Sequence, residues 1–168
     1  MSEQDHYYHD RLSMALDDLL RCKRYCEMML KLSIGEAFTE ERTVYEALFV
    51  SFIVSYGRVF TGSHAVKNHQ EVNGKYGNLR TKMTNALDGK LNKLHERIMN
   101  KRHTAIAHSA GSSRNYQHYT GCSIPIGRTP YVPYDHEEVG WALELTGMLI
   151  SNICEEQTRE GQILVKST

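Results

Sequence analysis

The chain has 168 residues and a mass of 19.3 kDa, with 40% hydrophobic and 24% charged residues. A chain of this size buries roughly 70% of the surface that its unfolded form exposes, so it needs no metal or disulfide to build a core. The composition excludes a largely disordered protein. We therefore expect one globular domain over residues 1–168.

Basic and acidic side chains are equal in number, so the formal net charge is zero, but the charges are unevenly distributed. Residues 1–57 carry −4 and residues 135–168 carry −5, whereas residues 58–103 carry +7 and residues 104–134 carry +2. Affinity for phosphate depends on the local field and not on the average charge. The neutral total therefore does not exclude RNA, and the basic block predicts a basic groove in an otherwise acidic protein.

The sequence favours a cytoplasmic protein. The first residues are polar and acidic, without the apolar core of a signal peptide. The longest apolar run, residues 47–54, is interrupted by Ser51 and falls short of the ~20 residues that a membrane span needs. Four cysteines are present: Cys22, Cys26, Cys122 and Cys154. We expect free thiols in a reducing compartment, with Cys22 and Cys26 buried rather than bound to a metal.

Two helices are predicted in the first third of the chain. Residues 3–32 place leucines on one face and charges on the others, and Gly35 can take the left-handed conformation that follows a helix. Thr39 is expected to cap a second helix that runs to Phe60. This helix is apolar nearly all round, as is typical of a helix that is central to a bundle or that faces a second subunit.

Two further helices are predicted, at residues 82–108 and 136–157, the latter capped by Asp135. Residues 61–82 are expected to be a connection with little regular structure. Residues 112–135 contain all three prolines and four tyrosines, and predict a β-hairpin or an irregular excursion. The expected fold is all-α: an up-and-down four-helix bundle with this excursion between helices three and four.

The third predicted helix has an apolar seam with heptad-like spacing, formed by Leu87, Leu91, Leu94, Ile98 and Ala105, and this pattern breaks near its C-terminal end. Measured from Ile98 at about 100° per residue, Arg102 falls at about +40° and His108 at about −80°. The two residues would lie ~9 Å apart along the axis, so they cannot pair on one helix but could converge across a two-fold axis. Histidine suits acid–base catalysis and arginine suits a phosphate. The alternative interpretation is a cation cluster that favours the helix dipole.

A second polar group interrupts the apolar second helix. Ser51, Ser55 and Arg58 share one face of it, at i, i+4 and i+7. The pattern fits either a phosphate-binding role for Arg58 or close helix packing with Arg58 at a surface.

At these residues the sequence resembles a known family. Asn100-Lys-Arg-His-Thr-Ala-Ile-Ala-His108 is similar to the R-x(4–6)-H signature of the HEPN superfamily, in which a polar residue, here His103, follows the arginine. Phe52-Ile-Val-Ser-Tyr-Gly-Arg-Val-Phe60 resembles the segment that precedes this motif in abortive-infection members. The resemblance covers about residues 44–110, and the flanking helices match by architecture alone.

The resemblance implies a homodimer in which Arg102 and His108 of both subunits form one composite site. It further implies a metal-independent ribonuclease without a cofactor, a toxin or an antiviral defence protein, that acts on RNA. His103 and Arg58 would then orient groups or bind phosphate, and Tyr56 would support the site. An antitoxin or a nucleotidyltransferase-like protein is the expected partner, and no membrane is involved.

Two other functions remain open at this point. The first is a non-catalytic HEPN-type module that binds nucleotides, RNA or a protein. The second is a purely structural helical dimer. Likewise, the tyrosines of residues 112–135 could stack on bases, or could belong to a hairpin packed on the bundle.

Overall fold

The computed structural model describes residues 3–61, 78–107 and 133–166, and this part of the chain contains helices but no strand. The helices are α1 (Glu3–Met29), α2 (Glu40–Phe60), α4 (Leu79–Thr84), α5 (Gly89–Lys101), the π-helix η1 (Arg102–Ala107) and α6 (His136–Lys166). The predicted all-α class is confirmed for these residues. Most of the predicted excursion, residues 112–132, lies outside the described ranges.

Two predicted helix starts are confirmed by their capping side chains. The Thr39 hydroxyl accepts a hydrogen bond from the Arg42 N–H at 3.2 Å, and the Asp135 carboxylate accepts one from the Glu138 N–H at 2.8 Å. Such caps satisfy backbone donors that have no partner within the helix. Gly35 has φ +69, the left-handed conformation expected of it, although α1 already ends at Met29.

The prediction of one continuous helix over residues 82–108 is wrong. Helix α4 ends at Thr84, and a new helix, α5, begins at Gly89. Asp88 separates them, because its backbone is extended (φ −67, ψ 171) and its carboxylate accepts a hydrogen bond from the Leu91 N–H at 2.7 Å. Aspartate favours this capping position over a helix interior, so it starts a second helix instead of continuing the first.

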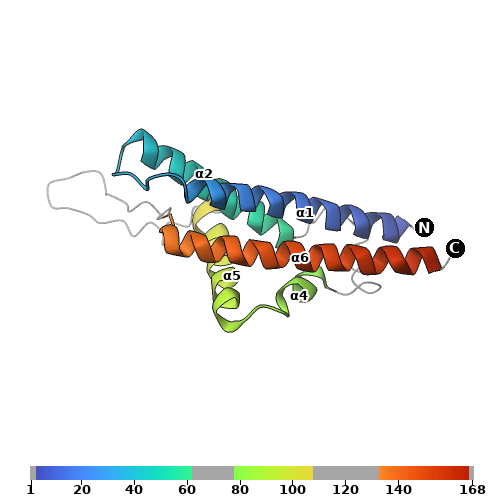
Figure 1. Cartoon of the computed structure of the whole chain (residues 1–168). Helices are drawn as coiled ribbons and strands as arrows, with labels where there is room; N and C mark the ends of the chain where they lie inside the picture. The colour runs from blue at the N-terminus through green and yellow to red at the C-terminus, as the bar shows by residue number, and fades with distance from the viewer. Residues whose placement is uncertain (1–2, 62–77, 108–132, 167–168) are drawn as a thin grey trace.

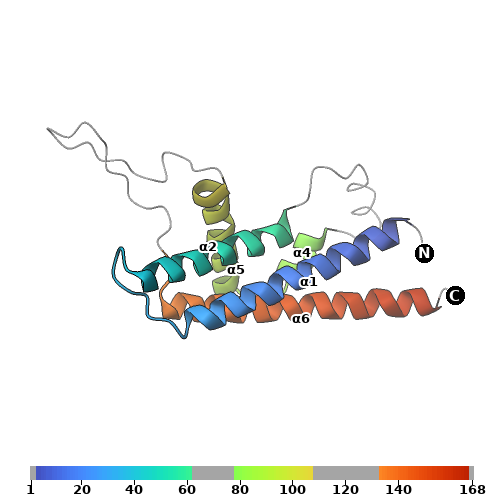
Figure 2. The same ribbon diagram turned by 90° about the horizontal axis from the view of Figure 1, so that it is seen from above.

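The three long helices α1, α2 and α6 run roughly along one axis, and the described N- and C-terminal ends lie at the same end of the molecule (Figure 1). Helix α1 packs against both α2 and α6. Helix α5 crosses α6 at a steep angle in both views (Figures 1 and 2). The predicted up-and-down arrangement of four helices is therefore not confirmed, since α5 does not run alongside α1, α2 and α6.

One apolar core joins the helices. The predicted seam of the third helix is confirmed in α5, where Leu91, Leu94 and Ile98 are at most 2% exposed. Cys22 and Cys26 are fully buried free thiols, also as predicted. Burying a large apolar side chain stabilises a fold by about 1.5–3 kcal/mol. The core therefore holds α5 against the long helices and fixes the place where η1 begins.

Helix α2 is long and apolar enough, by length and composition, to cross a membrane, although no membrane span was predicted from the sequence. The central helix of a bundle has the same composition. Here α2 packs against α1, α5 and η1, while Val44 and Val54 remain 48% and 37% exposed. Helix α2 is thus a core helix with one exposed apolar edge.

Candidate functional site

Arg102 lies where α5 passes into the π-helix η1. Its backbone N–H is shared between the carbonyls of Ile98 and Met99, and residues 102–107 then continue with π-helical geometry. Segments of π-helix are rare in proteins, and those that occur often lie at functional sites. The constant 100° per residue used to predict the direction of His108 does not apply across η1, because its hydrogen bonds run from i to i+5. His108, the other predicted catalytic residue, lies outside the described residues.

The alkyl part of the Arg102 side chain packs directly over Gly57 in α2. A Cβ atom at position 57 would lie 1.9 Å from Arg102 Cδ and 2.5 Å from Arg102 Nε. Only glycine permits this approach, so Gly57 determines where the guanidinium leaves the surface of α2. Gly57 was not predicted to be a site residue. The sequence feature that could have indicated this role is a glycine inside an apolar helix, since such a glycine often marks a close contact.

Arg102 is half-buried as a residue, and its guanidinium has no carboxylate partner among the described residues. The polar atom beside it is Nδ1 of the exposed His103, 3.5 Å from a terminal nitrogen of Arg102. Residues 108–132, which follow η1 in the sequence, contain no aspartate or glutamate. A partly buried arginine of this kind favours an anionic ligand, and its planar fork suits the oxygens of a phosphate.

Other cations of α5 are engaged by the start of α6. Arg97 forms an ion pair with Glu138 at 3.0 Å. Lys101 Nζ lies 5.5 Å from the centre of the Tyr134 ring, and burial lowers the pKa of Lys101. Lys101 Nζ also lies 5.8 Å from the centre of the Phe49 ring in α2. Arg102, by contrast, forms no ion pair with α6 among the described residues, so its positive charge is not neutralised there.

Arg58 does not join Arg102. Its Nε and Nη2 atoms bind the two carboxylate oxygens of Asp18 in α1 at 3.1 and 2.5 Å, and this pairing raises the pKa of Arg58. Successive helix residues point about 100° apart, so Arg58 faces α1 while its neighbour Gly57 faces Arg102. The structure therefore favours the alternative interpretation, close helix packing with Arg58 at a surface, and adds an ion pair with Asp18 that was not predicted.

Tyr56 belongs to the core. Its side chain is 0% exposed, and its hydroxyl lies 2.8 Å from Nδ1 of His95, which is 1% exposed. Burial raises the pKa of Tyr56 and lowers the pKa of His95 to about 4, so both stay neutral near pH 7. A direct contact between Tyr56 and an RNA phosphate is not compatible with this burial. Tyr56 instead fixes α5 on α2 through His95, which was not predicted to be a site residue.

The described residues thus bring Arg102, His103 and Gly57 together and leave Arg58 and Tyr56 elsewhere. Within the same ranges, no cluster of three histidine, cysteine, aspartate or glutamate side chains could hold a metal ion. Comparisons of the chain with protein-family models, with curated proteins and with solved structures gave no match. What the arrangement can do is therefore inferred from its chemistry: it can bind a phosphate at the start of the segment that leads to His108.

Proposed function

We propose that this chain is a metal-independent endoribonuclease of HEPN type that acts as a toxin or an antiviral defence protein. The observation that supports it best is the Arg102 guanidinium, which Gly57 positions and no described carboxylate neutralises. The proposal includes the finer fold, a HEPN-type bundle whose four helices are α1, α2, α5 with η1, and α6. An antitoxin or a nucleotidyltransferase-like protein would restrain the activity in the cell.

The proposed reaction is attack of an RNA 2′-hydroxyl on the adjacent phosphorus. The attack breaks the bond to the 5′ oxygen, and leaves a 2′,3′-cyclic phosphate and a 5′-hydroxyl. His108 would accept the proton of the attacking hydroxyl or donate one to the leaving oxygen. Arg102 would bind the non-bridging oxygens and stabilise the charge that develops on them. His103, beside Arg102, would orient the guanidinium, and two copies of the chain would form the composite site.

A second function, an RNA-binding module without catalysis, is favoured by one specific observation. Two of the residues predicted to support catalysis are engaged elsewhere: Arg58 by Asp18 and Tyr56 by His95. The groups that remain, Arg102 and His103, are sufficient to bind a phosphate. The two functions differ in whether a product forms.

An assay with end-labelled RNA in excess EDTA separates them. We expect the wild-type chain to cleave RNA, and Arg102→Ala and His108→Ala to abolish cleavage. Lys93→Ala is the matched control, since it removes an exposed cation from α5 away from the motif. Binding that Arg102→Ala weakens, without any product, would select the non-catalytic module. A chain that neither binds nor cleaves RNA would exclude both functions.

A further inference from the structure

One face of α2 stays at the surface, although the opposite side of the helix is buried in the core. Its residues follow one another at spacings of 4, 3, 4, 3 and 4, so they share an arc of about 80° on the helix. These six residues, the outer face of α2, are Glu40, Val44, Ala47, Ser51, Val54 and Arg58. The two valines are the large apolar side chains of the face, and they are 48% and 37% exposed.

The middle of the outer face is apolar and made of short side chains. The Ser51 hydroxyl donates a hydrogen bond to the Ala47 carbonyl at 2.7 Å, so it is satisfied within its own helix. The face between Val44 and Val54 can therefore lose its water without leaving a polar group unpaired. An exposed apolar face with heptad-like spacing is typical of a helix that packs against a second helix.

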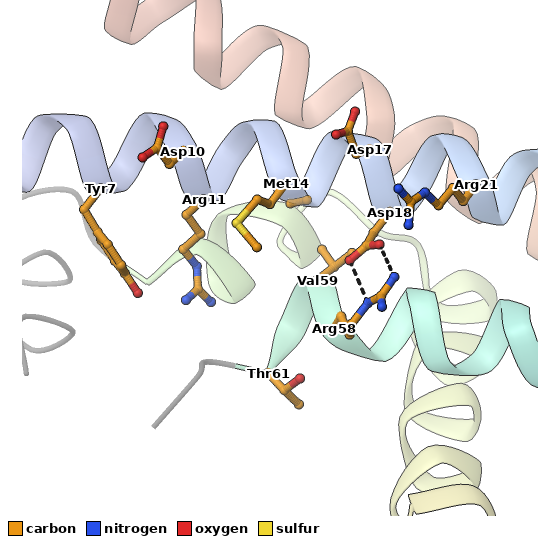
Figure 3. A pocket seen from close by; sticks show the side chains of 11 residues that line it. Tyr7, Asp10, Arg11, Met14, Asp17, Asp18, Arg21, Arg58, Val59 and Thr61 are labelled. Carbon is orange, nitrogen blue, oxygen red and sulfur yellow. Dashed lines mark hydrogen bonds and ion pairs between the residues drawn. The ribbon is translucent and has the colours of Figure 1, made fainter. Parts of the chain in front are cut away.

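The two ends of the outer face carry opposite charges. Glu40 is exposed at the start of α2. Arg58, at the other end, binds Asp18 of α1 through Nε and Nη2 (Figure 3), and these two hydrogen bonds do not use Nη1. The Arg58 side chain is 49% exposed, so it can accommodate a second carboxylate beside Asp18. An acid, an apolar middle and a base thus follow one another along the helix.

This order of groups is complementary to itself, because the spacings read the same in both directions. When two copies of the outer face meet with their helices antiparallel, acid lies opposite base and apolar opposite small or apolar. The opposed pairs are Glu40 with Arg58, Val44 with Val54, and Ala47 with Ser51. A two-fold interface needs such self-complementarity, since every pair occurs twice in it. A parallel arrangement would instead place like charges together, which is unfavourable.

We propose that the outer face of α2 binds the same face of a second copy of the chain, with the two α2 helices antiparallel across a two-fold axis. Gly57, which contacts Arg102, lies about 100° around α2 from Arg58 and so flanks this face. A two-fold axis between antiparallel helices keeps such a flank on the same side of both. The two Arg102 turns would then lie on one side of the dimer, a consequence that rests on the proposed function, whereas the interface does not.

Light scattering after size-exclusion chromatography of the full-length chain tests the interface. We expect twice the 19.3 kDa mass of one chain. Val54→Glu should raise the dissociation constant of the dimer by about 30-fold or more, because it buries two carboxylates without partners. Leu20→Glu is the matched control, since Leu20 is 39% exposed and lies about 200° around α1 from Asp18, which faces α2. It should leave the mass unchanged.

Cysteine cross-linking tests the antiparallel register and does not depend on how Val54→Glu folds. Chains with Cys122 and Cys154 replaced by serine would carry either Ala47→Cys or Ser51→Cys. Under mild oxidation, a mixture of the two variants should form disulfide-linked dimers faster than either variant alone, because position 47 lies opposite position 51. Cross-linking no faster in the mixture than in the separate variants would overturn the proposal.

A wild-type chain that stays monomeric, or a dimer that Val54→Glu does not weaken, would also overturn the proposal and would leave the outer face to another protein. None of these measurements uses RNA. A dimer that does not cleave RNA would therefore contradict the proposed function alone, and a monomer that cleaves RNA would contradict the interface alone.

Discussion

Replacing Gly57 by alanine should separate the stability of the fold from the function of Arg102. The new Cβ would lie 1.9 Å from Arg102 Cδ, so the arginine side chain must move. The displaced group is a flexible side chain, and its rearrangement costs about 0.5–1.5 kcal/mol. Alanine in place of glycine inside a helix contributes about 0.5–1 kcal/mol of stability. These effects nearly cancel, so the free energy of unfolding should stay within about 1 kcal/mol of the wild-type value.

The effect on RNA should be much larger. Charge-assisted hydrogen bonds are worth about 1.5–3 kcal/mol, so moving the guanidinium from its place should weaken RNA binding or cleavage by roughly 10- to 150-fold. Thermal unfolding would be followed by circular dichroism, and RNA affinity by fluorescence anisotropy. Gly147→Ala is the matched control, since a Cβ there meets nothing within 4 Å. RNA affinity that falls equally in both variants, or that does not change in Gly57→Ala, would refute the role given to the Gly57–Arg102 contact.

Three further predictions concern the elements that hold this site. His95 has a pKa of about 4 in the folded chain against 6.5 when exposed, so the unfolded chain binds more protons between these two pH values. The free energy of unfolding should therefore rise from pH 4 to 6.5 by up to about 3 kcal/mol. Denaturant titrations should show a smaller rise with pH in His95→Gln, and an equal rise in the variant and the wild type would contradict this. Glu156→Gln breaks a buried ion pair with Lys82 and should cost about 2–4 kcal/mol in urea unfolding, whereas Glu144→Gln at an exposed position should cost under about 0.5 kcal/mol. Asp88→Ala removes the cap of α5 and should lower the free energy of unfolding by about 1 kcal/mol, and a stability equal to wild type would show that α5 does not need this cap.

The sequence predicted the elements whose signals are local. The caps at Thr39 and Asp135 need only a short polar side chain and a free backbone donor nearby, and both are found. The apolar seam of α5 also follows from spacing alone. The break at Asp88 was not predicted, because a heptad-like spacing of leucines continues across it and favours one continuous helix. Asp88 is nevertheless as good a capping residue as Thr39 and Asp135, which were predicted.

The candidate site was only partly predictable, because it depends on contacts between helices. Nothing local shows that Arg58 pairs with Asp18, forty residues earlier, or that Tyr56 is buried against His95. Both residues were assigned to the site because residues 52–60 resemble the segment that precedes the motif in HEPN proteins, and both point away from Arg102. The π-helical geometry of η1 was also not foreseen, since a periodicity argument assumes one constant helical repeat.

We propose that Arg102 and His108 cleave RNA without a metal ion. Mass spectrometry of the RNA fragments that the purified chain forms in EDTA tests it most directly. We expect fragments ending in a 2′,3′-cyclic phosphate for the wild-type chain, and none for His108→Ala at the same concentration. Intact RNA with the wild-type chain, or the same fragments with His108→Ala, would contradict it.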